Sequence, residues 1–468
     1  MAILPGKFTI ETLSISSSEG RGIIDISQIY QQINIFESIL TPCITGYIIV
    51  TDTFNLISGK RFGLPIMGNE ILTIEVTVPS YYIQNENDTW SQAFPNKITF
   101  FGRVTDIKNI TLVNEGAQNY EIHFCSEELI LDKSLTLSKS YGTKTYGEMV
   151  GKIFDENFNT VSSVEIEKTL GNFTLAIPNW NPIQTINWMA SRSLSANNGT
   201  PQFFFYQSLY NDGITNYTNR SYTKDRRNVS STKYWFLSLD ELISLWGNDV
   251  RKTIFFNPAN NSALGSKLDP ESTMNFSNAM NYQIVHSFNT LENVTKGMFN
   301  SRMISHDMVN KTWTKTDYNY DKHFKDYYHL DPGKFFSGVA NSKNKKFTDD
   351  DYASSHIMLT STGSPDNPNY LTSISSARID RVQALNNFRV QLLIPGDGLT
   401  ESGDIINFDL KSREVGGNGQ LSDQFYSGKY LVNSIKHTFS RNPSEYNMTL
   451  DCSKESLNQE VTRFTPGD

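Results

Sequence analysis

The sequence predicts a mainly β protein of the α+β class, in which two homologous small antiparallel β-barrels flank a mixed α/β middle region. Apolar and polar residues alternate along both ends of the 468-residue chain, whereas helical spacing marks the part between them. The composition agrees, because 12% of the residues are aromatic and 19% are charged, a mixture that suits strands and turns.

The first barrel domain is expected over residues 1–127, with alternating strands from about residue 45. The strand patterns lie at residues 46–52, 70–78, 97–104 and 120–125. Turn-rich stretches of Gly, Pro, Asn and Ser separate them. Several short strands at this spacing are typical of a small antiparallel barrel or sandwich.

Helical spacing begins in the next part of the chain, residues 128–280, where we expect a mixed α/β domain. Residues 145–158 place apolar side chains on one helical face, and residues 181–194 begin with Asn-Pro, a favourable helix start. The pattern then predicts a strand at 202–206 and a polar insertion around 211–276.

A second mixed region is expected over residues 281–376. Its patterns predict a helix at 289–299 and a strand or hairpin at 301–318. A helix at 377–388 then leads into the second barrel domain, residues 377–468.

Three strand motifs of the first barrel recur in the same order near the end of the chain. The matched positions are Gly68 with Gly403, Gly102 with Gly428, Val104 with Val432, Ile107 with Ile435, Lys108 with Lys436, Tyr120 with Tyr446, and Cys125 with Cys452. Chance similarity between strand-rich segments would explain two matching motifs. Three in order favour a duplicated domain, in which residues 377–468 approximately repeat 45–127.

The charge balance argues against a protein whose task is to hold nucleic acid. The formal net charge is -8, whereas non-specific nucleic-acid binding needs a basic surface. The sequence has no signal-peptide pattern and no run of the ~18 apolar residues that cross a membrane. We therefore expect synthesis in a cytoplasm and no membrane insertion.

Three cysteines, Cys43, Cys125 and Cys452, are odd in number, far apart and without a CxxC pair. This pattern disfavours a zinc ribbon or a disulfide framework. We expect buried, reduced side chains that behave as small apolar groups.

The sequence offers little that predicts catalysis. Residues 142–148 have the glycine spacing of a phosphate-binding loop, but Glu148 stands where lysine is required, so an ordinary turn before a helix is expected. Asp349, Asp350 and Asp351 are expected to be a solvated charge run in a loop. Paired glycosidase carboxylates need no local spacing, so the sequence neither indicates nor excludes them.

One segment has the residue types of a metal site. His323, Asp326, His329 and Asp331 supply suitable ligand atoms at a spacing that brings them to one side of a turn or short helix. The alternative, polar residues of an aromatic segment that face solvent, is favoured because such scattered groups are common. We therefore expect no metal site and no cofactor.

Aromatic residues gather in two parts of the middle region. They are Phe203–Tyr206, Trp313, Tyr318, Tyr320, Tyr327 and Tyr328. A sugar-stacking surface is one interpretation. Core packing and a subunit interface are favoured, because large aromatic side chains dominate both.

Taken together, these segments resemble a known family by their layout. The relevant parts are the strand at 68–76, Phe101-Gly-Arg-Val-Thr-Asp-Ile with its return near 121–128, the helices at 146–158 and near Trp188, and the final segment from Phe388 through Pro395-Gly-Asp-Gly to Leu450. The order of these elements resembles that of the central baseplate hub protein of contractile-tailed phages, and it covers most of the chain. Residues 211–276 and 331–351 have no counterpart and are expected to be insertions.

The resemblance implies a structural virion protein without enzymatic activity, located in the tail baseplate and assembled in the host cytoplasm. It implies a homotrimer whose six tube-like barrels form a pseudo-hexameric ring, with residues 281–376 contributing to a trimeric cup. The implied partners are the tail-tube ring, the central spike, other baseplate proteins and the genomic DNA that passes through without sequence-specific binding. A trimer of duplicated chains matches both a six-fold and a three-fold neighbour.

Two alternatives remain at this point. A tail-associated enzyme that degrades polysaccharide or peptidoglycan would need an acidic cleft holding a carboxylic acid with a raised pKa. The related injection machinery of bacteria fuses hub and spike in one chain. Because this sequence ends at Phe464-Thr-Pro-Gly-Asp without a repetitive spike, a separate spike is expected.

Overall fold

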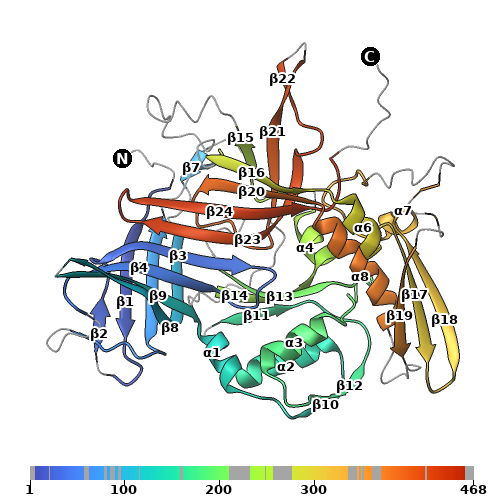
Figure 1. Ribbon diagram of the computed structural model, residues 1–468, viewed down its shortest axis with the longest axis horizontal. Helices are drawn as coiled ribbons and strands as arrows, with labels where there is room; N and C mark the ends of the chain where they lie inside the picture. Colours follow the sequence, from blue (N-terminus) through green and yellow to red (C-terminus); the bar gives the residue numbers. More distant parts are fainter. Residues whose placement is uncertain are drawn as a thin grey trace.

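Figure 1 shows the computed structural model of the chain. It describes residues 6–20, 22–56, 63–78, 82–84, 90–92, 96–114, 116–158, 162–209, 232–247, 249–256, 277–335, 345–346, 349, 353–360, 370–416 and 419–458. Most of the predicted insertion at 211–276, as well as Asp350, Asp351 and the last ten residues, lies outside this part.

One large sheet dominates the structure, which is mainly β as predicted (Figure 1). Eleven of its 14 strands follow one another in the order β16-β20-β24-β23-β3-β4-β9-β8-β5-β1-β2. The N-terminal strands are β1 (Thr9–Ser16), β2 (Ile23–Asp25), β3 (Tyr30–Ser38), β4 (Thr45–Asp52), β5 (Ile71–Val78), β8 (Asn96–Asn114) and β9 (Ala117–Ser126). The later ones are β15 (Thr253–Phe256), β16 (Asn281–Ser287), β20 (Phe388–Pro395), β21 (Ile405–Gly416), β22 (Gly419–Ser422), β23 (Gly428–Ser440) and β24 (Glu445–Lys454).

The strands form one continuous sheet rather than two separate barrels. Among the described strands the order shows no closed barrel, and β23 continues beyond its partner β21 and pairs with β3. The sequence motifs predict the strands but not their pairing partners. The pairing of β23 with β3 could therefore not be predicted from the sequence.

Two groups of five strands within this sheet have the same order and the same antiparallel pairing. The first is β3-β4-β9-β8-β5, and the second is β16-β20-β24-β23-β21. We call them the N-terminal set and the C-terminal set. β16 belongs to the second by its pairing, although it precedes residue 377. The domain boundaries and the duplication itself stay predictions.

A pair of backbone hydrogen bonds has the same geometry in both sets. In the N-terminal set, the Asn69 N–H donates to the Val104 carbonyl (2.8 Å) and the Val104 N–H donates to the Glu70 carbonyl (2.9 Å). In the C-terminal set, Gly403, Val432 and Asp404 make the same two bonds at 2.8 and 2.9 Å. Asn69 and Gly403 both have positive φ, 66° and 92°, a conformation that Asn and Gly tolerate best.

The core of the sheet is continuous across both sets. Its inward side chains alternate along each strand as the period of two requires, and they include Ile33, Ile35, Ile48, Phe124, Ile435, Phe439 and Leu450. Burial of such side chains is the main favourable term in folding.

The middle region packs two helices on a small sheet below the large one (Figure 1). The sheet has the order β11-β14-β13, with β11 (Ser163–Ile166), β13 (Phe203–Leu209) and β14 (Thr232–Ser238). A ladder of β10 (Ser140–Lys144) and β12 (Phe173–Ala176) lies beside it. The two helices packed on this sheet are α2 (Tyr146–Asn157) and α3 (Pro182–Ala190), and the region also contains α1 (Glu127–Ser134) and α4 (Leu239–Trp246).

The predicted helices at 145–158 and 181–194 are confirmed. Thr145 and Glu148 form a capping box at the start of α2. The segment before it, which was expected to be an ordinary turn, is instead the strand β10 (Ser140–Lys144), and the helix follows it directly.

A third group of elements projects to one side of the large sheet (Figure 1). It consists of the sheet β18-β17-β19 with α6 (Thr290–Lys296), α7 (Tyr320–His323) and α8 (Leu371–Leu385). The strands are β17 (Asn300–Asp307), β18 (Thr312–Asn319) and β19 (Ser354–Thr360), so the predicted hairpin at 301–318 is confirmed. Of the aromatic residues, Phe203, Phe205, Tyr206, Tyr318 and Tyr320 are buried as expected, whereas Trp313 and Tyr328 are exposed.

Gly46 on β4 provides a test of the sheet packing. A Cβ at this position would lie 2.3 Å from the Asn34 carbonyl oxygen and 2.3 Å from the Phe124 ring, so Gly46→Ala forces backbone or ring to shift. We expect a loss of ~1–3 kcal/mol in the free energy of unfolding, measured by denaturant titration. Gly142→Ala is the control, because its Cβ meets nothing within 4 Å. Equal stabilities of the two variants would contradict the packing described.

Candidate assembly interface

The junction between β23 and β3 shows how one set of strands joins another. β23 pairs with β21 through residues 428–431 and with β3 through residues 434–440. The second register is antiparallel and runs from Ser434 opposite Ser38 to Ser440 opposite Gln32. Strands of different sets therefore add edge to edge and leave no gap in the ladder.

Glu37 on β3 ties this junction to the middle region. Its buried carboxylate accepts the backbone N–H of Leu209 (2.7 Å), at the end of β13, and of Ser402 (3.0 Å), in the turn before β21. The His437 Nε2 lies 3.5 Å from Glu37 Oε1, and His437 Nδ1 lies 2.9 Å from the Tyr446 hydroxyl. A buried carboxylate with two N–H donors fixes three segments in one arrangement.

Buried ion pairs connect the third group of elements with the middle region and with the end of the C-terminal set. Arg381 on α8 pairs with Asp240 on α4, and its Nη1 donates to the Tyr328 carbonyl oxygen at 3.1 Å. Just after β24, Glu455 Oε2 lies 2.7 Å from His329 Nδ1. Lys454 Nζ lies 3.3 Å from Asp331 Oδ2. Each pair joins segments that are distant in sequence, so loss of one partner would leave a buried charge uncompensated where two groups of elements meet.

Two further cations from the segment before β15 reach the C-terminal set. Arg251 binds both carboxylate oxygens of Asp404 at 2.8 and 3.2 Å, and Lys252 pairs with Asp397. Burial alone would raise the pKa of Asp397, but Lys252 and the N–H groups of Leu399 and Thr400 outweigh burial and lower this pKa to about 2. Asp397 therefore stays ionised at every physiological pH.

Asp380 on α8 is a buried carboxyl group with a raised pKa. Burial raises its pKa to about 7, against the opposing effects of the Tyr318 hydroxyl, which donates to Oδ2 at 3.1 Å, and of Arg381. The side chain is 3% exposed and lies between α8 and β18. A glycosidase acid also needs a raised pKa, but it must reach a substrate, and Asp380 is enclosed in the core.

The residues of the predicted metal candidate are separated in the structure. His323 pairs with Asp326 (2.8 Å), whereas His329 contacts Glu455 and Asp331 contacts Lys454. Within the described ranges, no three His, Cys, Asp or Glu side chains converge on one point. Asp349 Oδ2 accepts the N–H of Lys346 within its own loop.

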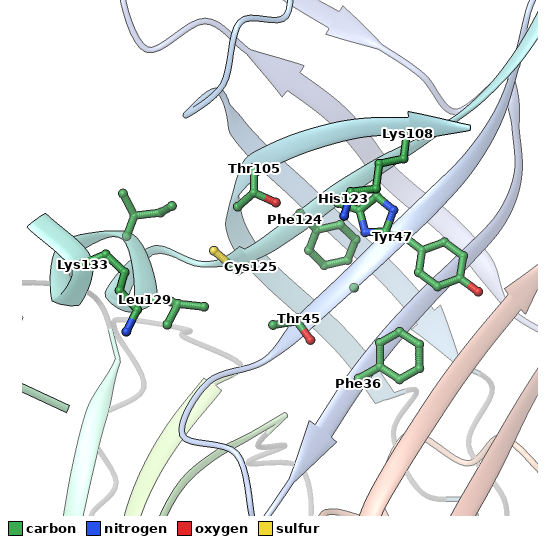
Figure 2. A pocket seen from close by; sticks show the side chains of 12 residues that line it. Phe36, Thr45, Tyr47, Thr105, Lys108, His123, Phe124, Cys125, Leu129 and Lys133 are labelled. Carbon is green, nitrogen blue, oxygen red and sulfur yellow. The ribbon is translucent and has the colours of Figure 1, made fainter. Parts of the chain in front are cut away.

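Figure 2 shows a pocket of about 500 Å³ on the outward face of β3, β4, β9 and β8, beside α1. Its side chains include Phe36, Tyr47, Thr105, Lys108, His123, Phe124, Cys125, Leu129 and Lys133. No carboxylate is among the described residues that line it. Burial raises the pKa of the Cys125 thiol to about 12, so this sulfur is a poor nucleophile. The lining suits packing against an apolar surface better than acid–base chemistry.

All three cysteines are free and buried, which confirms the prediction for these residues. The structure also contains, in the part it describes, no helix long and apolar enough to cross a membrane.

The structure places the matched repeat residues on corresponding strands. Gly68 and Gly403 lie in the turns before β5 and β21, and the others lie on β8 and β9 or on β23 and β24. Val104, Ile107 and Lys108 face Phe124, Ile122 and Glu121 across a one-residue bulge. Val432, Ile435 and Lys436 face Cys452, Leu450 and Thr449 across a similar bulge.

When the two sets are aligned by their strand pairing, Cys452 opposite Val432 corresponds to Phe124 opposite Val104, and not to Cys125. Tyr120 and Tyr446 also differ in position: the Tyr120 hydroxyl donates to Asp52, whereas the Tyr446 hydroxyl contacts His437. Gly102 on β8 lies opposite Leu72 on β5, and Gly428 on β23 lies opposite Phe408 on β21.

Sequence reasoning missed β3, which joins the two sets, and β16, the last strand of the C-terminal set. The apolar residues Ile33 and Ile35 alternate in β3, which is a usable signal. β16 is short, and residues 288–387 separate it from β20, its partner in the sheet. Nothing in the local pattern connects these two strands.

Comparison with known proteins rests on structure, because no family model and no curated protein matches the sequence. The 43 kDa tail protein of prophage MuSo2 from Shewanella oneidensis is 9% identical and has a TM-score of 0.51, with 95% of this chain and 99% of that chain covered. The tail protein from Neisseria meningitidis MC58 is 10% identical over 96% and 97% of the two chains, at a TM-score of 0.48.

A third similar structure is the E. coli c3393 protein, a component of the type VI secretion system. It is 9% identical, at a TM-score of 0.41 over 98% of this chain and 79% of that chain. The fold of the Shewanella oneidensis protein matches that of this chain over nearly the full length of both. The chain thus has the fold of phage tail proteins, as the resemblance of its sequence to that group predicted.

Proposed function

We propose that the protein is the baseplate hub of a phage tail, a homotrimeric adaptor between the hexameric tail tube and the trimeric central spike. The fold supports a structural role in the tail. The observation that carries the finer proposal is the presence, in one chain, of two strand sets with the same order and pairing. Three chains present six such sets, so the same particle can match a six-fold ring on one side and a three-fold spike on the other.

The charge of the chain supports a passage for DNA through this ring. Genomic DNA must slide without being held, and a net charge of -8 avoids the basic surface that would trap phosphates. We propose a neutral or acidic channel, and further contacts with other baseplate proteins around the ring. In this function the protein is a rigid adaptor whose symmetry matches its two neighbours, and it binds no cofactor.

The test is the mass of the purified protein, measured by light scattering after size exclusion, together with negative-stain images. We expect three chains per particle and a ring with a central hole and a pseudo-six-fold outline. If the free protein is monomeric, addition of the spike protein should produce the trimer. A protein that stays monomeric with its spike and cleaves envelope glycans would contradict the hub proposal.

A further inference from the structure

The pocket in Figure 2 lies between a row of aromatic side chains and helix α1. The row crosses β3, β4 and β9, with the Phe36 and Tyr47 ring centroids 5.9 Å apart and the Tyr47 and His123 centroids 5.5 Å apart. Leu129 and Ile130 of α1 line the other side. Both sides therefore offer apolar surface against which a ligand can pack.

The basic side chains of the pocket contrast with the charge of the chain. Lys108, Lys133 and His123 line the pocket, and its described lining residues include no carboxylate, although the net charge of the chain is -8. Lys108 is 55% exposed and Lys133 is 71% exposed, so both ammonium groups are accessible. Figure 2 shows the two lysines at opposite ends of the pocket. A ligand that binds both of them has to be extended and negatively charged at two points.

Three carboxylates approach these basic side chains from outside the pocket lining. Asp106 lies 3.5 Å from Lys108, Glu121 lies 3.2 Å from His123, and Asp132 lies 3.2 Å from Lys133. Asp106 and Lys108 are both more than half exposed, so water screens the attraction between them. The pairs leave both ammonium groups in contact with solvent, and each lysine can therefore bind a second carboxylate.

The C-terminal set has polar side chains in place of the aromatic row, although its strands pair in the same way. When the sets are aligned by pairing, the positions of Phe36, Tyr47 and His123 correspond to those of His286, Gln391 and Asp451. Asp451 forms an ion pair with Arg389 on the neighbouring strand. The strand arrangement therefore does not require aromatic residues on this face, and each chain carries the pocket residues once.

We infer that this pocket binds an acidic segment of another protein chain. An apolar or aromatic side chain of the segment packs between the aromatic row and α1, where Tyr47 and Ile130 contact it. Carboxylates on either side of this anchor bind Lys108 and Lys133. Aromatic side chains with a charged rim are typical of the surfaces at which proteins bind one another.

The geometry favours a peptide over single-stranded nucleic acid, which also stacks on aromatic rings. A nucleic acid carries a phosphate at every nucleotide and needs basic side chains along its whole path. Asp106 and Glu121 lie beside the basic side chains of the pocket and would repel such a backbone. A peptide can place its carboxylates at the two lysines alone.

The inference goes beyond the proposed hub and rests on that function only for the number of sites per particle. A trimer has three such pockets among its six strand sets, because the C-terminal set lacks the aromatic row. The acidic segment would therefore bind the ring with three-fold rather than six-fold symmetry.

The test uses the full chain and a pool of short fluorescein-labelled peptides. In each peptide, aspartate or glutamate residues surround one benzoylphenylalanine, a photoreactive aromatic residue. We expect irradiation to label residues 36–47 and 123–133, identified by mass spectrometry after digestion. Binding followed by fluorescence anisotropy should weaken as salt is added, because the lysine contacts are exposed. A control pool with lysine in place of the acidic residues should not label these segments.

Charge reversal at both ends of the pocket tests the role of the lysines. Lys108→Glu with Lys133→Glu should weaken binding of the acidic pool by ~10-fold or more, with an unchanged melting temperature. Lys315→Glu with Lys322→Glu is the matched control, because both side chains are exposed and lie in the third group of elements. This control should bind as the wild type does.

A second variant fills the pocket without removal of a charge. Thr45 is an exposed residue of β4 that lines the pocket, so Thr45→Trp should block labelling while the protein stays folded. Absence of labelling at the pocket in the wild type, or equal binding by the two double-lysine variants, would overturn the inference. Tighter binding of oligothymidylate than of the acidic pool would also overturn it. A monomeric chain that is labelled at the pocket would contradict the hub proposal and support this inference.

Discussion

Replacement of Arg381 by leucine should destabilise the protein by ~3–5 kcal/mol. The guanidinium is 4% exposed and pairs with Asp240, which is 1% exposed, so the variant leaves a buried carboxylate without its counter-charge. The same guanidinium stacks over the Tyr327 ring at 4.9 Å and donates to the Tyr328 carbonyl oxygen. We expect a lower denaturant midpoint, followed by tryptophan fluorescence, because Trp246 ends the helix that carries Asp240.

Arg302→Leu is the matched control for this prediction. Arg302 Nε donates to Asp317 at 2.8 Å, but this pair is partly exposed and should contribute about 0–1 kcal/mol. The double variant Asp240→Asn with Arg381→Leu should recover part of the stability, since it removes the unpaired charge. A single Arg381→Leu variant as stable as Arg302→Leu would show that the buried pair does not hold α4 against α8.

Stability should fall as the pH rises from about 4 to about 7, through Asp380. Its folded-state pKa is about 7, whereas an unfolded aspartate titrates near ~3.9. Between these values the folded state binds more protons than the unfolded state, so the free energy of unfolding decreases with rising pH. The difference of about three units corresponds to a loss of up to ~4 kcal/mol, complete above pH 7.

Asp380→Asn should remove this contribution. The amide oxygen can still accept the Tyr318 hydroxyl, so the variant should be more stable than the wild type at pH 8 and similar to it at pH 4. Thermal unfolding at a series of pH values measures the slope, and Asp249→Asn, an exposed carboxyl, is the control. A variant that keeps the wild-type slope would assign the pH dependence to another group.

The sequence predicted the secondary-structure elements that are determined by residues close together in the chain. The helix α2 follows from an apolar face and a capping box at Thr145, and the β17–β18 hairpin follows from alternation interrupted by one turn. The mainly β class and the tail-protein fold were predicted correctly for the same reason: order and spacing of elements are visible along the chain.

The parts that could not be predicted depend on contacts between distant segments. The separation of Thr438 and Asn34 is 404 residues, so no local pattern reveals that β23 continues into β3. The separation of His323 from His329 by a turn is equally a tertiary effect, because Glu455 and Lys454 from the end of β24 bind the second half of the segment. The residue types are those of a metal site, but the fold determines which partner each histidine and aspartate side chain binds.

β3 and its partner β23 are far apart in the sequence, so they are synthesised at different times. β3 leaves the ribosome about 400 residues before its partner, which takes ~20–80 s at ~5–20 residues per second. During this time the edge of β3 and its apolar residues Ile33 and Ile35 are unpaired, so the nascent chain is exposed to aggregation and to chaperones. A chain that stops before Gly428 cannot cover this edge. A truncated chain of this kind therefore keeps an unpaired apolar edge that the finished chain has covered.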